Sequence, residues 1–362
     1  MADPNTVRIL SLDGGGVRGY LSLKWLQRFI QQWGITPNEI WKYFDVITGT
    51  SIGGIQALGY AYGKSPDELE PFFTNEAKRL FTIRTAAEAA LFQCNAGTDS
   101  NRPSLAQKII ILLGDAVYNR DAFYLPYCPY TASPPGTSNY GVNILHDTLV
   151  NQFGTDTLQE LKTKSLIPAY EVDTTTYVLF SNYIDPLFTN PTAKLVDVAM
   201  STAAAPAYLP EYSFNNHTYI DGGVYQNNPA ELALTLAKAA KPTATRSCVL
   251  SIGTGIGEMG FYSPPTELLS GTESVISTIF SLFDVATTGG QESVDFNLKM
   301  RSQRTLEQLY YYRFQPMLDQ ATQNTELDNS DVSFLAYMEN LANSSFDADI
   351  DNINNFIGHL IA

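Results

Sequence analysis

The sequence predicts an α/β fold with a mainly parallel central sheet flanked by helices. Over the first 60 residues, short apolar runs that end in glycine-rich turns alternate with segments of helical periodicity. The resulting order of strand, helix, strand, helix favours parallel strands joined by crossover helices. The composition fits a large buried core, because 44% of the 362 residues are hydrophobic and only 16% are charged.

The elements follow from local patterns. An apolar run predicts a strand over residues 7–12, and apolar residues at helical spacing then predict a helix that Gly34 ends. A second strand over 44–47 runs into another glycine-rich turn and a helix that lasts to about Gly63. Ser65 and Glu68 form a capping-box pattern that opens a third helix.

The remaining chain is predicted to alternate in the same way. Residues 82–140 form a loop-rich excursion, and helices are expected over 142–153, 195–204, 228–240 and most of the tail beyond 267. Strands are expected over 167–172 and 177–180, which pair, and over 218–220, 247–252 and 309–314. We expect a single catalytic domain over residues 1–362, with its motifs within 7–257 and a helical part from about 263 packed on it.

Charge and cysteine content narrow the functional classes. The 22 basic and 37 acidic residues give a net charge of −15, which repels phosphate polyanions, so no nucleic-acid partner is expected. Cys94, Cys128 and Cys248 lie far apart and indicate free thiols in a reducing compartment. Without a signal-peptide pattern or a run of about 18 apolar residues, a cytoplasmic protein with no transmembrane segment is predicted. Export by a route that needs no signal peptide stays open.

A nucleophile elbow is predicted at Gly49-x-Ser51-x-Gly53, between the second strand and the second helix. A serine there sits on a sharp turn with its hydroxyl exposed, and the glycines let strand and helix approach closely. The helix N-terminus adds a field that favours an anion. Because serine also caps helices well, a simple helix N-cap is the alternative.

A glycine-rich loop over residues 13–19 follows the first strand and could bind an oxyanion through its backbone N–H groups. Gly14, Gly16 and Gly19 also match the G-x-G-x-x-G pattern of dinucleotide-binding proteins. We discount that interpretation, because the pattern recurs at residues 255–260 and no acidic residue closes a second strand about 20 residues downstream. A purely structural turn stays open as an alternative.

Asp221 ends a later predicted strand and is followed by two glycines. Because the carboxyl ends of parallel strands converge on one edge of a sheet, Asp13, Ser51 and Asp221 could meet there. The alternative for Asp221 is a turn aspartate that bonds its own backbone.

No histidine suits the base of a Ser-His-Asp triad. Of the three in the chain, His146 precedes Asp221 within a helical pattern, and His217 lies near the start of the strand that Asp221 ends. His359 lies beside apolar residues at the C-terminus. A carboxylate that acts directly on the serine is therefore the more economical hypothesis.

Taken together, these motifs resemble those of the patatin-like phospholipase family. Residues 13–19 are similar to its oxyanion loop, 49–54 to its nucleophile elbow and 221–223 to its catalytic aspartate motif. Residues 201–210 resemble its Ser-Ala-Ala-Pro segment, 250–255 its Ser-Leu-Gly-Thr-Gly strand end, and 311–315 a later strand. The motifs occur in the order and spacing of the family.

The resemblance implies a three-layer sandwich with a Ser–Asp dyad and no histidine. It implies that Ser51 attacks an ester carbonyl and that Asp221 takes the proton and later activates water. The oxyanion would be held by the N–H groups of Gly15 and Gly16, with Gly14 shaping the loop. Arg18 would steady the loop or meet a phosphate. No cofactor or metal is expected.

The implied function is a lipid acyl hydrolase of the phospholipase A or lysophospholipase type. Its partner would be lipid at a membrane interface, which implies transient membrane association, and an unidentified activator stays open. Alternatives are an acyltransferase that uses the same acyl-enzyme and a catalytically silent lipid- or nucleotide-sensing module. Apolar candidates for the interfacial mouth are residues 123–127 and 275–283, although the second run fits a core helix better.

Overall fold

The computed structural model describes residues 5–80, 144–183, 192–206, 208–209, 211–257, 272–304, 308–319, 322–323, 325 and 327–361. Within the helix 272–302, side chains are described from residue 285 onward.

The strands form one central sheet and one small accessory sheet. The central strands are β1 Thr6–Leu12, β2 Val46–Gly49, β3 Lys164–Glu171, β4 Thr176–Ser181, β5 Tyr212–Phe214, β6 His217–Asp221, β7 Arg246–Ile252 and β9 Gln308–Phe314. They lie in the order β5-β6-β3-β2-β1-β7-β9, and β4 also pairs with β3. The pairs from β3 through β2, β1 and β7 to β9 are all parallel, which confirms the predicted mainly parallel sheet. The accessory pair is β8 Ile256–Gly257 and β10 Met317–Leu318.

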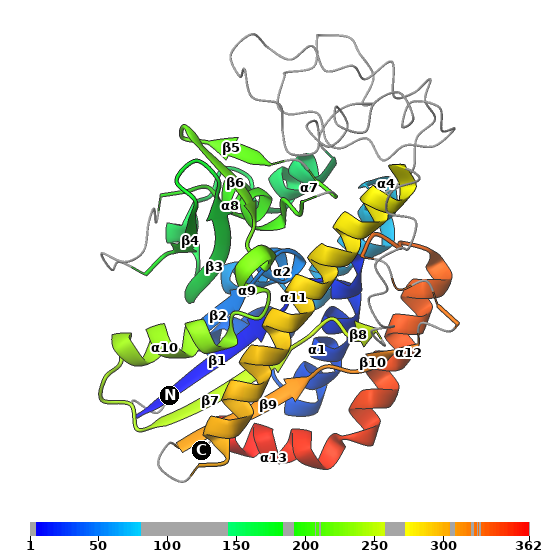
Figure 1. Cartoon of the computed structure of the whole chain (residues 1–362). Helices are drawn as coiled ribbons and strands as arrows, with labels where there is room; N and C mark the ends of the chain where they lie inside the picture. The colour runs from blue at the N-terminus through cyan, green and yellow to red at the C-terminus, as the bar shows by residue number, and fades with distance from the viewer. Residues whose placement is uncertain are drawn as a thin grey trace.

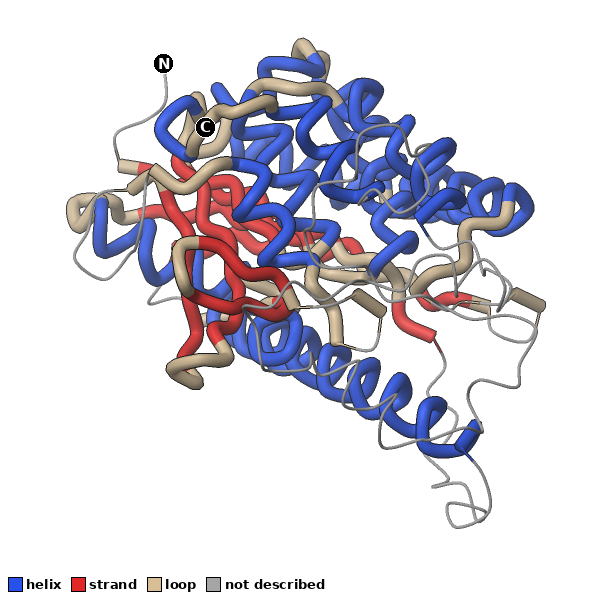
Figure 2. The backbone as a smooth tube through the Cα atoms, turned by 90° about the horizontal axis from the view of Figure 1, so that it is seen from above, coloured by secondary structure: helices blue, strands red, loops and turns tan. Residues whose placement is uncertain are grey.

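Helices cover both faces of the central sheet, so the fold has three layers (Figures 1 and 2). One layer contains α1 Gly19–Trp33, α2 Ile52–Tyr62, α8 Leu195–Ala203, α12 Val332–Ala348 and α13 Ile350–Ile361. The other contains α10 Ala230–Ala240 and α11 Thr272–Ser302. The shorter helices are α3 Pro66–Pro71, α4 Ala77–Leu80, α7 Ile144–Phe153 and α9 Gly223–Gln226.

Alternate residues of β1 face the two helical layers. Leu10 and Leu12 belong to the core formed with α1, α2 and α8, whereas Val7 and Ile9 belong to the core formed with α10 and α11. All four side chains are fully buried. Burial on both faces explains why the strand appears in the sequence as a continuous apolar run.

The predicted helix boundaries are confirmed by their capping residues. Gly34 ends α1 and Gly63 ends α2, each in the left-handed region, with φ of 74° and 104°. At the start of α3, the Ser65 N–H donates to the Glu68 carboxylate at 2.8 Å. The Glu68 N–H donates back to the Ser65 hydroxyl at 3.2 Å, which completes the capping box.

The C-terminal part of the chain completes the same sheet and its cover. β9 extends the sheet beside β7, with Tyr311 opposite Val249. α12 packs along α1, and α13 packs against β9 (Figure 1). The expected late strand and the helical tail are therefore confirmed.

Several predictions concern residues that the structure does not describe. These are the loop-rich segment 82–140 with its apolar run 123–127, and Cys94 and Cys128. The run 275–283 lies in α11, where side chains are not described. Cys248 is a buried free thiol. Within the ranges given above, none of the helices combines the length and apolar character that a membrane crossing needs.

Candidate active site

Ser51 lies on a sharp turn between β2 and α2. Its backbone has φ 56° and ψ −128°, a conformation that non-glycine residues rarely adopt. Close packing requires the two flanking glycines. A Cβ on Gly49 would lie 2.1 Å from the Gly53 oxygen, and a Cβ on Gly53 would lie 2.4 Å from the Leu12 oxygen. The turn therefore has the geometry of a nucleophile elbow.

Neighbouring threonines hold the elbow in this conformation. Thr202 Oγ1 accepts a hydrogen bond from the Ser51 N–H at 3.0 Å and donates its own hydrogen to the Pro168 carbonyl at 2.6 Å. Thr50 donates to the Gln226 carbonyl at 2.7 Å. The strained turn is thus fixed by contacts from α8, β3 and α9.

Asp221 ends β6 and is 1% exposed. Its Oδ1 accepts a hydrogen bond of 2.6 Å from the Gly223 N–H, and its own N–H donates to the Ala204 carbonyl at 2.9 Å. Burial raises the pKa of Asp221 from 3.8 to about 7, and hydrogen bonds from the Ser51 side chain and Gly223 oppose part of that rise. A carboxylate with a pKa close to neutral is well suited to accept a proton and return it.

Ser51 and Asp221 meet because two strands point toward each other along one edge of β3. β2 pairs in parallel with residues 164–166 of β3, whereas β6 pairs antiparallel with residues 169–171. β4 pairs with residues 166–171 and so occupies the opposite edge of β3. The C-terminal ends of β2 and β6 therefore face each other, with Asp221 opposite Ala169 and close to the elbow.

The direction of β6 corrects our expectation about this meeting. We expected Asp221 to reach the site at the C-terminal edge of a parallel sheet, together with Ser51 and Asp13. β6 is antiparallel to β3, so it runs toward the C-terminal end of β2 from the opposite direction. Asp13 directly follows β1, but its buried carboxylate accepts a hydrogen bond from Arg313.

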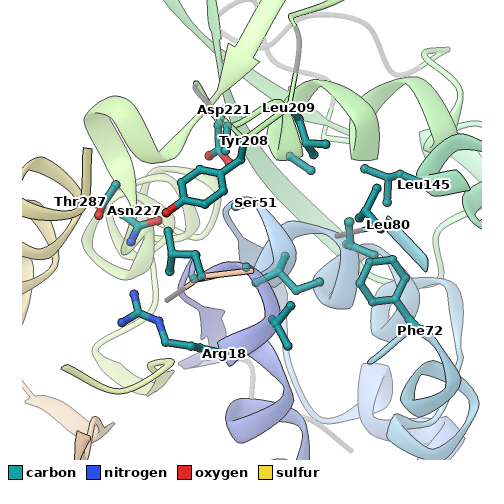
Figure 3. A pocket seen from close by; sticks show the side chains of 18 residues that line it. Arg18, Ser51, Phe72, Leu80, Leu145, Tyr208, Leu209, Asp221, Asn227 and Thr287 are labelled. Atoms are coloured by element: carbon teal, nitrogen blue, oxygen red, sulfur yellow. The ribbon is translucent and has the colours of Figure 1, made fainter. Parts of the chain in front are cut away.

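Ser51 and Asp221 border a cavity with a polar and an apolar side (Figure 3). The polar side carries Arg18, Asn227 and Thr287. The apolar side is formed by α2, α4, α7 and the π-helical turn 72–76, through the side chains of Ile55, Phe72, Leu80 and Leu145. The arrangement can hold an ester whose apolar chain and polar group leave Ser51 in different directions.

The glycine-rich loop forms one wall of this cavity. Gly15, Gly16 and Arg18 line it, and Gly14 packs against the elbow, where a Cβ on Gly14 would lie 3.1 Å from Ser51 Cβ. Arg18 is the N-cap of α1 and Ser51 is the N-cap of α2, so two helix N-termini border the cavity and favour negative charge there. Among the residues that the structure describes, the N–H groups of Gly15 and Gly16 have no hydrogen-bond acceptor.

Asp13 forms a buried ion pair behind the loop. Arg313 of β9 donates to its carboxylate and, at 2.8 Å, to the Ser251 hydroxyl. The side chains of Arg313 and Asp13 are 4% and 0% exposed. Burial raises the pKa of Asp13, and the guanidinium of Arg313 opposes that rise. The pair ties the end of β1 to β7 and β9.

This ion pair leads to a stability prediction. Replacing Arg313 with methionine leaves a buried carboxylate without its charged partner, so the free energy of unfolding should fall by about 3–5 kcal/mol. The double variant Asp13→Asn/Arg313→Met removes both charges and should recover most of the loss. Urea denaturation followed by circular dichroism measures both variants. Equal losses in the single and the double variant would contradict this role of the pair.

None of the three histidines borders the cavity. His217 Nδ1 lies 3.0 Å from the Glu171 carboxylate near the outer end of β6, and His359 stacks on Tyr310 near the start of β9. His146 lies on α7. As expected from the sequence, no histidine is brought to the serine. Within the described ranges, no group of three or more histidine, cysteine, aspartate or glutamate side chains could hold a metal ion.

Sequence reasoning missed the polar residues that support this site. Thr202 lies in the segment 201–210, whose resemblance to the family's Ser-Ala-Ala-Pro segment predicts no contact for this side chain. Asn227 precedes an Asn-Pro pair that indicated only a helix cap. Gln291 of α11 donates its amide hydrogen to the Gly14 carbonyl at 3.4 Å. Nothing in the local pattern distinguishes it, because it lies in a long helix far from the other motifs.

The fold and the site define a class of protein: an α/β protein whose serine elbow faces a buried carboxylate and a glycine-rich loop. Residues 10–234 match the family model described as patatin-like phospholipase. This match covers more than half of the chain, and the chain belongs to the patatin-like phospholipase family.

Several characterised proteins are similar to this chain. A cGAMP-activated phospholipase of Vibrio cholerae is 34% identical over 238 residues, which are 64% of this chain and 57% of that protein. Patatin-like protein 3 of Arabidopsis thaliana is 28% identical over 278 residues, or 69% of this chain and 59% of that protein. Calcium-independent phospholipase A2-gamma of Rattus norvegicus is 24% identical over 346 residues, or 92% of this chain and 38% of that protein.

The chain therefore spans little more than half the length of the first relatives, with 57% and 59% of two of them covered. Among solved structures, VipD from Legionella pneumophila aligns with 95% of this chain and 68% of its own, at 13% identity and a TM-score of 0.39.

Proposed function

We propose that the chain is a lipid acyl hydrolase that cleaves fatty-acyl esters through an acyl-enzyme on Ser51, with Asp221 as general base. The observation that carries this proposal is a serine on a strained elbow that borders the same cavity as a buried carboxylate whose pKa is raised to about 7. Membership of the patatin-like phospholipase family supports the reaction class.

In the first half-reaction, Asp221 takes the hydroxyl proton of Ser51 while Oγ bonds to the ester carbonyl carbon. Negative charge develops on the carbonyl oxygen, where the N–H groups of Gly15 and Gly16 stabilise it. When the tetrahedral intermediate collapses, the ester C–O bond breaks and Asp221 returns the proton to the departing alcohol. The acyl group stays on Ser51.

In the second half-reaction, water takes the place of the alcohol. Asp221 accepts a proton from this water as its oxygen bonds to the acyl carbon, and the same N–H groups hold the oxyanion. Collapse breaks the bond between the acyl carbon and Ser51 Oγ, and Asp221 protonates that oxygen. The fatty acid leaves, and both residues return to their starting state.

Two further residues have supporting roles in this proposal. Gly14 shapes the loop behind the oxyanion position. Arg18 lines the polar side of the cavity, where its charge would steady the loop or meet a phosphate of the substrate.

We also propose that the chain acts as one catalytic domain, because β9 joins the central sheet and α12 and α13 contribute to its core.

The apolar side of the cavity is proposed to hold the acyl chain, which leads to a prediction about chain length. Leu145→Trp should shorten this side, because the leucine lines the cavity and is 3% exposed. We expect hydrolysis of a long-chain p-nitrophenyl ester to fall by about 10-fold or more, a loss of about 1.4 kcal/mol in transition-state binding. Hydrolysis of the butyrate ester should change little.

Val150→Trp provides the matched control, because Val150 lies on the same helix and is 39% exposed. It should leave the preference for chain length unchanged. The acyl-site assignment would be wrong if both tryptophan variants kept the wild-type ratio of long-chain to short-chain hydrolysis, with circular dichroism showing that both are folded.

The function itself is tested with vesicles of mixed phospholipids and lysophospholipids. We expect wild-type protein to release free fatty acid, and product analysis in the presence of glycerol reports whether a different acceptor takes the acyl group. Transfer to glycerol in preference to water would replace hydrolysis with acyl transfer. The proposal would be overturned if folded wild-type protein cleaved neither p-nitrophenyl esters nor vesicle lipids, with or without cGAMP.

An activator is included in this test. Relatives from Vibrio cholerae and Escherichia coli carry the name cGAMP-activated phospholipase. We therefore propose cGAMP as the first activator to examine, and each assay should be run with and without it. A rate that rises with cGAMP in wild type and stays absent in Ser51→Ala supports activation of the same site.

A further inference from the structure

Side chains from three distant parts of the chain hold the carbonyl of Gly14. Thr254, which follows β7, donates its hydroxyl hydrogen to this oxygen at 3.0 Å. Asn227, which follows α9, and Gln291 of α11 each donate an amide hydrogen to it at 3.4 Å. Thr254, Asn227 and Gln291 are 0%, 5% and 5% exposed, and together we call them the Gly14 clamp.

The Gly14 clamp determines where the next N–H group points. In a trans peptide the C=O and the N–H point to opposite sides, so a Gly14 oxygen held against the clamp turns the Gly15 N–H away from it. Gly15 lines the cavity beside Ser51. The N–H groups of Asp13, Gly14 and Val17 all donate to backbone carbonyls, whereas that of Gly15 has no acceptor among the described residues.

The peptide between Gly14 and Gly15 needs such support. Glycine backbones rotate at low cost, so this peptide could flip and take its N–H out of the cavity. The clamp packs directly against both residues. A Cβ on Gly14 would lie 2.1 Å from Asn227 Oδ1, and a Cβ on Gly15 would lie 2.2 Å from Thr254 Oγ1.

Gln315, which follows β9, supports the clamp from behind. Its Nε2 donates to Gln291 Oε1 at 3.0 Å, and its own Oε1 accepts from the Gly255 N–H at 2.8 Å. Because Gln291 Oε1 accepts the hydrogen bond from Gln315, the Nε2 of Gln291 is the atom that faces the Gly14 carbonyl. Thr254, Gln291 and Gln315 all lie beyond the stretch 10–234 that matches the family model.

We infer that Thr254, Asn227 and Gln291 are positioning residues for the oxyanion hole, which hold the Gly14 carbonyl so that the Gly15 N–H stays directed at the reacting ester oxygen. The inference rests on the proposed acyl hydrolase function. The active site then includes Thr254, which follows β7, and Gln291 of α11. Neither residue donates to the oxyanion itself, but both fix the orientation of the Gly15 N–H group that does.

Thr254→Val tests this inference, since it removes the shortest of the three hydrogen bonds and keeps the size of the side chain. Loss of a direct oxyanion donor costs about 10²–10³ in kcat, so loss of its support should cost about 10–100-fold. KM for p-nitrophenyl butyrate should change by less than about threefold, because the interaction strengthens only in the transition state. Thr254→Ser, which keeps the hydroxyl, should recover most of the rate.

Two further measurements separate positioning from general destabilisation. The affinity for a trifluoromethyl ketone acyl analogue, which forms an oxyanion on Ser51, should fall in proportion to kcat/KM, whereas the affinity for a non-hydrolysable ether lipid should not. Thr163→Val removes a hydroxyl-to-carbonyl hydrogen bond of 2.9 Å to Phe44, before the start of β3. This control should leave kcat unchanged.

Gln291→Met is a second test variant, in case Thr254→Val does not fold. Its kcat should fall by about 3–10-fold. Folded variants at both positions with kcat within about twofold of wild type would overturn the inference while Ser51-dependent hydrolysis persists. Absence of any Ser51-dependent hydrolysis in wild type, with cGAMP present, would overturn the proposed function and the inference with it.

Discussion

Replacing Ser51 with alanine is expected to lower kcat/KM for phospholipid vesicles and p-nitrophenyl esters by about 10⁴–10⁶-fold. The hydroxyl is the proposed nucleophile, and its loss removes the acyl-enzyme route while leaving the cavity intact. Steady-state fatty-acid release from identical vesicles measures the effect. Ser213→Ala, at an exposed serine that hydrogen-bonds to Thr218 across a hairpin, should retain full activity.

Ser51→Gly tests separately whether the backbone of the elbow is strained. It should lose as much activity as the alanine variant but unfold at a higher temperature, because glycine adopts φ 56° at little cost whereas alanine retains the strain. Full activity in either Ser51 variant would show that another residue is the nucleophile. Equal thermal stability of the two variants would show that the turn stores no strain.

Replacing Asp221 with asparagine is expected to lower kcat by about 10³–10⁴-fold, because the amide cannot accept the proton of Ser51. Wild-type kcat/KM should follow the ionisation of this carboxyl. Since the base must be deprotonated and its pKa is raised to about 7, the rate should rise about tenfold per pH unit below that value and level off above it. A rate independent of pH between about 5 and 9 would contradict this role.

The same substitution should make the protein more stable, with a defined dependence on pH. The pKa of Asp221 is about 7 in the folded protein and has an ordinary value of 3.8. Folding therefore favours the protonated form of Asp221. The stability of the wild-type protein is highest at pH values below the ordinary pKa of 3.8, and part of it is lost as the pH rises through the folded-state pKa of about 7. The asparagine side chain carries no charge, so Asp221→Asn should gain up to about 4 kcal/mol above pH 7 and little at low pH. Thermal unfolding at both ends of this range measures the difference, and an equal gain at both would contradict the burial of a charge.

Most elements could be predicted because their signals act within a few residues. Gly34 and Gly63 mark helix ends through their left-handed backbone, and the Ser65 box marks a helix start. The strands that lie between two helical layers have both faces buried, which makes their apolar runs conspicuous.

The direction of β6 could not be predicted from its own residues. β6 has only five residues, His217–Asp221, and its sequence does not distinguish a parallel from an antiparallel strand. β6 forms a hairpin with β5, in which Asn215 and Asn216 have φ of 52° and 65°. Both values suit a tight two-residue hairpin turn, so the asparagine pair indicates that β6 is antiparallel to β5. The direction of β6 relative to β3 depends instead on how this hairpin pairs with β3.

The core of the candidate site could be predicted for the same local reason, whereas its support could not. Ser51 and Asp221 each sit in a short motif at the end of a strand. The donors to the Gly14 carbonyl lie 213, 240 and 277 residues away from it along the chain. Such contacts depend on how the sheet and α11 pack, which no local pattern encodes.

The most direct test of a Ser51–Asp221 dyad is peptide mapping by mass spectrometry after reaction with a long-chain fluorophosphonate. We expect a single phosphonyl adduct on Ser51 in active wild-type protein, much slower labelling in Asp221→Asn, and no adduct in Ser51→Ala. Wild-type protein that hydrolyses esters while it carries the adduct on a different residue, or carries none, would contradict the assignment of Ser51 as the nucleophile.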